Sequence, residues 1–432
     1  MASSIFHIKE HVLSTAHIRE YARATGLSQD DELLQHVKQY TPKDNPNPRK
    51  GDVTIIGAHA NAFPKELYEP LWENLHREAK ACGVRIRTIL IADAAWQGQS
   101  GLLNESKLGN DPSWHDYHRD ILHMINILRP PRPLVGMGHS FGAVTLANVA
   151  LASPRLFSTL VLMDPASSSF EAAPIGRHGS AEASTSLRRR DLWPSRAQAA
   201  ASFTRSPFFR TWDPRVLDLY VRYGLHPTSE SDPDGEVRLT TTKHQEVFTF
   251  SRPSWHAYDA EGRNPIDDND VRVATAPDLP HHAAGSGDDS FTFTWPFYRP
   301  EQIRSIRNLA HIRPSVLYVF ALMSSLSGPE QREEKMRLTG SGNGGSGGAK
   351  NGRVKAVLAE NNGHLVPMED PAMCAREAAS WISREMERWW AEERQYEEWT
   401  RKPYAEKACV TDEFKEWTVR GMEHVAKANA KL

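Results

Sequence analysis

The segment with the clearest chemical meaning surrounds Ser140 and reads Gly136-Met137-Gly138-His139-Ser140-Phe141-Gly142. A serine hydroxyl becomes a useful nucleophile only when it is exposed beside a base. The G-x-S-x-G pattern places such a serine on a tight strand-to-helix turn, where the flanking glycines leave room for the backbone. An apolar strand precedes this segment and a small-residue helix follows it, so we predict that Ser140 is the nucleophile of a serine hydrolase.

A base for this serine is expected on the loop after the last strand, because histidine follows the nucleophile and the acid in chain order. The last predicted strand covers Arg353–Leu358, and His364 lies just beyond it, preceded by Gly363. From this loop a histidine reaches back over the edge of the sheet. His364 is therefore the predicted general base.

The acid is less obvious from the sequence. The strand before the last one is followed by Ala321 and Leu322, and no carboxylate occurs until Glu330. The strand after the nucleophile instead ends in Asp164-Pro165, at the same edge of the sheet. A carboxylate there orients the imidazole and stabilises its charged form, so Asp164 is the predicted acid.

An oxyanion hole for this serine needs two main-chain N–H groups. One belongs to Phe141, directly after the nucleophile. The other comes from the loop after the third strand, which reads Gly57-Ala58-His59-Ala60-Asn61. Either Ala60 or Asn61 supplies it, and the sequence does not choose between them.

These residues require a sheet whose strand ends meet at one edge. Eight β-rich segments are separated by helical patterns, which is typical of an α/β fold with a doubly wound, mostly parallel sheet. The last five are apolar on both faces, as expected of central parallel strands. The predicted strands cover Ser4–Ile8, Leu34–Tyr40, Asp52–Ile56, Ile86–Ile91, Leu134–Met137, Thr159–Met163, Ser315–Phe320 and Arg353–Leu358.

The alternation of strands and helices breaks between residues 166 and 313. This stretch is too long for a loop without secondary structure, so we predict an inserted cap. The resulting organisation is a first part of the core over 1–165, the cap over 166–313 and a second part of the core over 314–402. A helical tail is predicted over 403–432.

Together these segments resemble the α/β-hydrolase superfamily and, more narrowly, the fungal peroxisomal serine hydrolases of toxin and secondary-metabolite pathways, among them acyl-CoA hydrolases. The resemblance rests on Gly57–Phe63, Gly138–Gly142, Val161–Pro165, Leu338–Gly348 and Gly363–Pro367. It implies an eight-stranded hydrolase sheet, a triad at Ser140, Asp164 and His364, a cap over the site and a homodimer. Several relatives carry Gly-Glu where this chain has Ala321-Leu322, and that departure removes a rival acid.

Composition limits the remaining possibilities. The 432 residues are 39% hydrophobic and carry a formal net charge of −2, which disfavours a nucleic-acid-binding role. Three scattered cysteines form no disulfide or zinc pattern, and no apolar run is long enough to span a membrane. We expect no metal or other cofactor.

Two further sets of residues point to a substrate and a compartment. Arg188, Arg189 and Arg190 could bind the phosphates of an acyl-CoA, and His139 is a candidate substrate-binding residue beside the nucleophile. The final residues Ala430-Lys431-Leu432 differ by one small residue from the S-K-L peroxisomal signal, which predicts binding to the peroxisomal import receptor and a place in the peroxisome matrix.

Other patterns carry less weight. The glycine run within Thr339–Gly348 lacks the ending of a phosphate-binding loop and is expected to be flexible. The helical set His115, His118 and His123 is expected to be exposed, and His281-His282 beside Asp288-Asp289 is expected to be solvated.

The predicted function is hydrolysis of an acyl-CoA thioester through an acyl-enzyme. Two alternatives remain on the same fold, a carboxylic-ester hydrolase and an acyltransferase. A third is a non-catalytic ligand-binding homologue.

Overall fold

The computed structural model describes residues 2–167, 181–253, 255 and 297–429. The chain divides into two units, residues 1–383 and 384–432. Helix α14 (Pro371–Thr400) begins in the first unit and ends in the second, which also contains α15 (Tyr404–Ala408) and α16 (Asp412–Asn429). The described part of the second unit thus consists mainly of helices.

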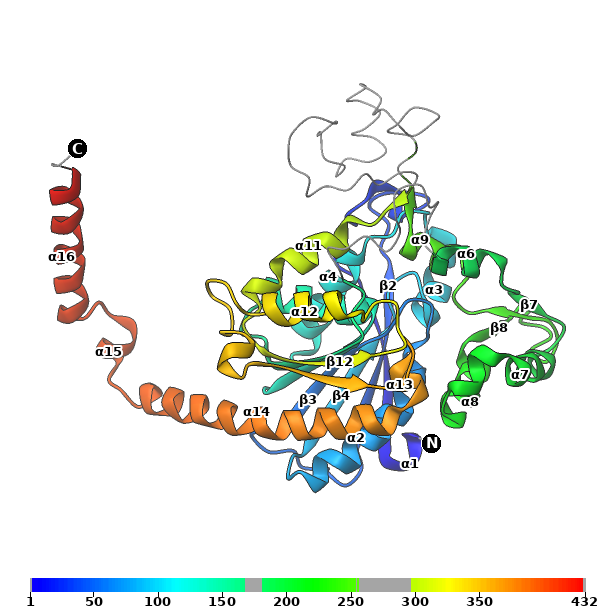
Figure 1. The fold of residues 1–432 in the computed structure, drawn as a ribbon, viewed down its shortest axis with the longest axis horizontal. Coiled ribbons are helices and arrows are strands. Elements are labelled where there is room, and N and C mark those ends of the chain that lie inside the picture. Colours follow the sequence, from blue (N-terminus) through cyan, green and yellow to red (C-terminus); the bar gives the residue numbers. More distant parts are fainter. Residues whose placement is uncertain (1, 168–180, 254, 256–296, 430–432) are drawn as a thin grey trace. The chain divides into compact units, whose positions relative to one another are not determined.

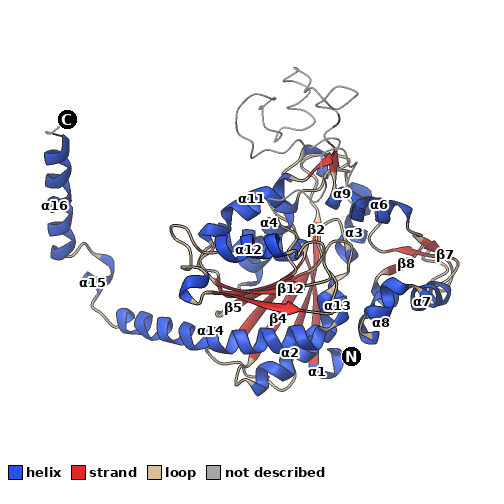
Figure 2. Ribbon diagram, viewed as in Figure 1, coloured by secondary structure: helices blue, strands red, loops and turns tan. Residues whose placement is uncertain are grey.

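The first unit is built on an eight-stranded sheet with the order β1-β2-β4-β3-β5-β6-β12-β13. Its first two strands pair antiparallel, β2 also runs antiparallel to β4, and all other pairs are parallel. This confirms the predicted mostly parallel sheet (Figure 2). The strands are β1 Phe6–Ser14, β2 Leu34–Pro42, β3 Val53–Ala58, β4 Ile86–Ala92, β5 Leu134–His139, β6 Phe157–Met163, β12 Ser315–Ala321 and β13 Val354–Ala359.

Two strand predictions need correction. Residues Ala2–Ile5 form a short helix (α1), and the first strand starts only at Phe6. The sequence located this strand poorly because most of its side chains are exposed and show no alternation of buried and exposed positions. The segment predicted at Arg353–Leu358 is not central but forms β13, which pairs within the described chain only with β12. Its middle residues are partly exposed, as expected for a strand at the edge.

Helices cover both faces of the sheet (Figure 1). On one face α5 packs against α4 and α11, and α11 packs against α12. The predicted cap segment 166–313 therefore includes a helix, α11, that packs on the core. The helices of the core are α2 Glu69–Ala81, α3 Gly98–Asn104, α4 Trp114–Leu128, α5 Phe141–Ala152, α11 Pro300–Asn308, α12 Pro329–Leu338, α13 Val366–Glu369 and the first part of α14.

Helix α5 lies at the centre of this core, and its residues 141–150 are all buried. It has no polar face because the sheet covers one side and the neighbouring helices cover the other, as its all-apolar and small composition requires. A helix fixed in this way gives the nucleophile at its N-terminus a rigid support.

Between β6 and α11 the described chain forms small elements, including the three-stranded sheet β7-β9-β8. We call residues 181–253 the cap region. Its elements are α6 Ala181–Arg188, β7 Leu192–Trp193, α7 Arg196–Arg205, α8 Pro214–Tyr223, β8 Leu225–Pro227, β9 Val237–Leu239, α9 Lys243–Phe250 and β10 Arg252–Pro253, which pairs with β11 Phe297–Tyr298.

The glycine run does not form the loose loop that its composition predicts. The N–H groups of Gly340 and Gly342 donate to the carbonyls of Leu309 and Ala310, both at 2.8 Å. The loop is therefore tied to the short helical turn that precedes β12.

Candidate active site

Ser140 lies on the turn between β5 and α5, with φ 55° and ψ −118°. This is a strained conformation for a residue with a side chain, and it occurs where a nucleophile must project from the turn. The two flanking positions must be glycine because other backbone atoms lie too close for a side chain. A Cβ on Gly142 would lie 2.3 Å from the carbonyl oxygen of Ala58, and one on Gly138 would lie 2.6 Å from the carbonyl oxygen of Gly142.

His364 bridges Ser140 and Asp164. Its Nε2 lies 2.7 Å from the Ser140 Oγ, and its Nδ1 lies 2.6 Å from Asp164 Oδ2. The loop that carries it, between β13 and α13, is fixed by the Gly363 N–H, which donates to the Glu369 carboxylate at 2.8 Å. The structure thus brings together the three residues that the sequence selected.

Asp164 follows β6 and is fully buried. Its Oδ1 accepts hydrogen bonds from the Ala321 N–H, at 3.2 Å, and from the Ser327 hydroxyl. Burial alone would raise the pKa of Asp164, but hydrogen bonding to His364, the electrostatic influence of that ring and the hydroxyls of Ser324 and Ser327 hold it below its ordinary value. The carboxylate is therefore kept ionised and oriented toward the imidazole.

A buried lysine supports the loop that donates to Asp164. The Nζ of Lys335 donates to the carbonyl of Leu326 at 3.3 Å, and its side chain has no exposed surface. Burial lowers the pKa of Lys335 to about 8, against the opposing influence of the Asp164 and Glu334 charges.

The loop after β3 carries the two candidate oxyanion donors, the main-chain N–H groups of Ala60 and Asn61, and they differ in their hydrogen bonding. The Ala60 N–H donates to the hydroxyl of Tyr68 at 2.9 Å. In the described part of the chain, the main-chain N–H groups of Asn61 and Phe141 have no hydrogen-bond partner. Of the two residues left open by the sequence, Asn61 is therefore the one with a free donor.

The side chain of Asn61 is held between the core and the cap region. Its Oδ1 accepts from Gln97 Nε2 at 2.6 Å, and its Nδ2 donates to the carbonyl of Glu246 on α9 at 3.1 Å. Gln97 also accepts from the Ala62 N–H at 2.8 Å and donates to the Thr249 hydroxyl at 3.1 Å. Helix α9 thus contacts the loop after β3 at Asn61, the residue that carries the free N–H group.

His139 does not line an open site as the sequence suggested. It is fully buried, its Nε2 lies 2.7 Å from the main-chain carbonyl of His364, and its Nδ1 lies 2.9 Å from the Tyr68 hydroxyl. Burial, together with the nearby His364 ring, lowers the pKa of His139 to about 3. This ring is therefore neutral and supports the backbone of the histidine beside the nucleophile.

The arginine run lies at the end of α6, and no contact joins it to the triad among the residues that the structure describes. Arg189 forms an ion pair with Glu246, and the Arg190 Nε donates to the Leu192 carbonyl at 2.6 Å. Arg188 is exposed.

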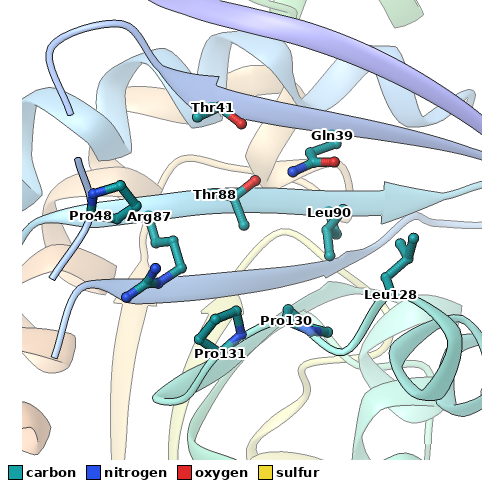
Figure 3. Close-up of a pocket in the computed structure, with 9 residues that line it drawn as sticks. All are labelled: Gln39, Thr41, Pro48, Arg87, Thr88, Leu90, Leu128, Pro130 and Pro131. Atoms are coloured by element: carbon teal, nitrogen blue, oxygen red, sulfur yellow. The ribbon is translucent and has the colours of Figure 1, made fainter. Parts of the chain in front are cut away.

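A pocket of about 230 Å³ lies elsewhere on the molecule (Figure 3). It is lined by residues of β2 and β4, the loop before β3, the end of α4 and the turn before β5. None of them belongs to the triad or to the loop after β3 that carries Ala60 and Asn61, which we call the oxyanion loop. These residues are Gln39, Thr41, Pro48, Arg87, Thr88, Leu90, Leu128, Pro130 and Pro131.

The remaining sequence candidates form no site within the described chain. His115, His118 and His123 are all half-buried and not exposed as predicted; the rings of His115 and His118 are in contact, and burial lowers the pKa of His118 to about 3. No described cluster of three or more His, Cys, Asp or Glu side chains is arranged to hold a metal ion. The tripeptide Ala430-Lys431-Leu432, His281-His282 and Asp288-Asp289 lie outside the described residues.

Four supporting residues escaped the sequence interpretation: Tyr68, Gln97, Ser327 and Lys335. A sequence signal existed only for Gln97, which lies shortly after the carboxyl end of β4, at the edge where the site forms. The other three are brought to the site by packing between segments distant in the chain.

Comparison with known proteins finds relatives of this chain and of its fold. The type I acyl-CoA thioesterase mpaH′ of Penicillium brevicompactum is 38% identical over 423 residues, covering 92% of each chain. The abhydrolase domain-containing protein AFT2-1 of Alternaria alternata is 29% identical over 256 residues, covering 59% of this chain and 84% of that protein. No family model matches the chain.

The solved structure of the peroxisomal α/β-hydrolase Lpx1 from Saccharomyces cerevisiae shares the fold. It covers 99% of this chain and 97% of its own, with a TM-score of 0.65 at 15% sequence identity. The architecture is therefore that of an α/β hydrolase. The chain belongs to the α/β-hydrolase family that contains the fungal type I acyl-CoA thioesterases.

This membership confirms the resemblance inferred from the motifs, which within the fungal serine hydrolases pointed to the acyl-CoA hydrolase of mycophenolic acid biosynthesis. Within the described chain, no helix has both the length and the apolar character that a membrane span needs.

Proposed function

We propose that the chain hydrolyses an acyl-CoA thioester to a free acid and CoA through an acyl-enzyme on Ser140. The observation that carries this proposal is the bridge made by His364, which lies within hydrogen-bond distance of both Ser140 and Asp164. Relatives that match the chain over almost their full length are named acyl-CoA thioesterases, and this supports the choice of a thioester.

The first half of the reaction forms the acyl-enzyme. His364 Nε2 accepts the Ser140 proton as Oγ bonds to the thioester carbonyl carbon. The tetrahedral intermediate then collapses, the carbon–sulfur bond breaks, and the CoA sulfur leaves with the proton from His364. Asp164, which stays ionised, holds the imidazole in the required tautomer and stabilises its charged form.

The second half releases the acid. His364 removes a proton from water, and the hydroxide attacks the Ser140 ester. The ester bond breaks as the proton returns to the serine oxygen. Each tetrahedral intermediate carries an oxyanion, which we assign to the N–H groups of Phe141 and Asn61, because neither has a hydrogen-bond partner among the residues that the structure describes.

The CoA portion of the substrate carries phosphates, and the exposed arginine run is a suitable partner for them. We assign Arg188 and Arg190 to this role. Arg189 is already paired with Glu246, so we assign it to support of the cap region instead.

The tripeptide Ala430-Lys431-Leu432 supports our proposal for the compartment. A receptor that reads Ala430-Lys431-Leu432 would deliver the protein to the peroxisome matrix. We therefore propose a peroxisomal step of fungal secondary metabolism.

The test uses purified full-length protein and a panel of aromatic, terpenoid and straight-chain acyl-CoAs, with CoA release measured by a thiol reagent. We expect turnover of some thioesters by the wild type, and for Ser140→Ala a loss on the order of 10⁴-fold or more. Full activity of this variant would refute the proposal.

The same assay separates the alternatives. Plain esters of the same acids test for a carboxylic-ester hydrolase, and added alcohols or amines test for acyl transfer by the appearance of an acylated acceptor. Binding of acyl-CoA without CoA release and without reaction with a fluorophosphonate would indicate a non-catalytic homologue.

A further inference from the structure

Behind the active site a line of buried hydrogen bonds joins the oxyanion loop to the backbone of the catalytic histidine. The Ala60 N–H donates to the Tyr68 hydroxyl, that hydroxyl lies 2.9 Å from His139 Nδ1, and His139 Nε2 lies 2.7 Å from the carbonyl oxygen of His364. We call this line the Tyr68–His139 relay. Tyr68 is 1% exposed and His139 is fully buried, so water does not compete for these bonds.

The protons in the relay can be assigned from chemistry alone. The carbonyl of His364 can only accept, so His139 Nε2 must carry a hydrogen. Burial keeps this imidazole neutral, so its Nδ1 has a lone pair and must accept. Tyr68 then donates its only hydrogen to His139, and its oxygen accepts from the Ala60 N–H. Every bond runs in one direction, from the oxyanion loop to the base.

The two ends of the relay belong to different halves of the catalytic apparatus. Ala60 directly precedes Asn61, whose N–H is the proposed second oxyanion donor. His364 carries the proposed base, and its main-chain carbonyl is the point that His139 holds. The two loops follow strands β3 and β13, which are separated in the sheet by β5, β6 and β12. Sheet pairing therefore does not connect them directly.

We propose that Tyr68 and His139 are positioning residues that fix the oxyanion loop and the catalytic histidine relative to each other, so that donor and base act on one carbonyl group. The proposal rests on the proposed function, because it concerns the same triad and the same oxyanion hole. Neither residue is a catalytic residue, since neither touches the reacting atoms.

The expected effect follows from how steeply catalysis depends on geometry. A displacement of about 1 Å in a catalytic group can cost on the order of 100-fold in rate, and loss of one oxyanion donor costs about 100-fold to 1000-fold. Loosening of one relay bond should cost less than complete loss of a donor. The ground-state contacts of the CoA portion are unaffected, so the loss should fall on kcat and not on KM.

Tyr68→Phe removes a single oxygen and is the primary variant. We expect kcat to fall about 10-fold to 100-fold with KM changed less than about twofold. The matched control is Tyr318→Phe, because Tyr318 is equally buried and its hydroxyl bonds to Thr339, at 2.7 Å, and to no other residue that the structure describes. The control should keep wild-type kcat.

His139 is tested by a pair of variants. His139→Leu removes both relay bonds and should lower kcat at least as far as Tyr68→Phe. His139→Gln places an amide N–H near the former Nε2 position, where it can donate to the His364 carbonyl, so it should recover part of the lost rate. A residue that only fills space would show no such recovery.

Inhibitor affinities separate positioning from general damage. A trifluoromethyl ketone analogue of the thioester forms an oxyanion on Ser140, whereas a thioether analogue does not. The relay predicts weaker ketone binding in Tyr68→Phe with unchanged thioether binding. Equal weakening of both, or wild-type kcat and ketone affinity in a folded Tyr68→Phe, overturns the proposal.

Failure of the relay and failure of the proposed function remain distinguishable. The rate at which a fluorophosphonate labels Ser140 depends on the triad and the oxyanion hole but not on acyl-CoA. If the wild type is labelled yet turns over no acyl-CoA, the substrate proposal fails, while a slower labelling of Tyr68→Phe still supports the relay. Labelling of Tyr68→Phe at the wild-type rate overturns it.

Discussion

The core and the cap region contribute different things to one site. Ser140, Asp164 and His364 each follow the carboxyl end of a strand of the eight-stranded sheet. Phe141 and Asn61 also follow strands, β5 and β3. The cap region contributes the Glu246 carbonyl that holds the Asn61 side chain, and it carries the arginine run that we propose as the CoA-binding part. On the proposed function, the chemistry depends on a rigid parallel sheet, whereas the cap region selects the substrate and supports one edge of the oxyanion loop.

This contrast predicts that changes in the core lower turnover of every substrate, while changes in the cap region alter how acyl-CoA is distinguished from a simple ester. Changes at the boundary between the two should lower turnover by an amount between that of the core variants and that of the cap-region variants.

The largest effect is expected in the core, for Asp164→Asn. An amide cannot hold the imidazole in the tautomer that accepts the serine proton, so kcat should fall on the order of 10⁴-fold. Steady-state CoA release checks this. Ser327→Ala, which removes only one donor to the same carboxylate, should cost far less, and a loss below 10-fold for Asp164→Asn would contradict the assigned acid.

A second core effect concerns stability and pH. Burial gives Lys335 a folded-state pKa of about 8, below its ordinary value of 10.5. Between these values the unfolded chain binds a proton that the folded chain does not, so the free energy of unfolding should rise with pH. The rise attributable to Lys335 should reach about 3 kcal/mol.

Urea unfolding between pH 7.5 and 10 measures this difference. Lys335→Met should show a flatter dependence on pH than the wild type, whereas the variant Lys350→Met, at an exposed lysine, should follow the wild-type curve. Identical pH dependence in the wild type and Lys335→Met would show that the buried ammonium does not titrate in this range.

At the boundary, Gln97→Leu removes the bonds from Gln97 to Asn61, Ala62 and Thr249. We expect kcat to fall about 10-fold for both thioesters and simple esters, because the oxyanion loop loses a support. Parallel kinetics on both substrate classes test this. The control is Gln99→Leu, since its side chain has no hydrogen-bond partner in the described chain; an effect limited to KM would be inconsistent with the assignment.

The smallest effect is expected in the cap region. Replacing Arg188 and Arg190 together by alanine should raise KM for acyl-CoA about threefold to tenfold, more at low salt, without affecting a short ester. Arg205→Ala, an exposed arginine on α7, is the matched control. An equal loss on acyl-CoA and on the ester would argue against contact with the CoA phosphates.

The core was predictable because its sequence patterns are local. Most of the apolar segments became strands within a few residues of their predicted bounds, and the small-residue helix predicted after the nucleophile is α5. The G-x-S-x-G turn and the carboxylate ending β6 share one edge because parallel strands align their carboxyl ends. That alignment brought Ser140 and Asp164 to His364.

The remaining features depend on contacts between distant segments. Our proposal of Asn61 over Ala60 rests on the Tyr68 hydroxyl, which accepts from the Ala60 N–H, and the proposed role of His139 depends on the carbonyl of a residue 225 positions later. The strands of the cap region are two or three residues long, too short to show alternation. Neither kind of feature leaves a periodic signal in the sequence.

The central claim is that Ser140 is the acyl-bearing nucleophile for acyl-CoA hydrolysis. Titration with a fluorophosphonate, followed by peptide mapping and by CoA-release assays on the same samples, measures it most directly. The account predicts one adduct on the peptide containing Ser140 and a loss of thioesterase activity in proportion to its occupancy. Full activity after complete labelling of Ser140, or inactivation that follows an adduct elsewhere in the chain, would contradict it.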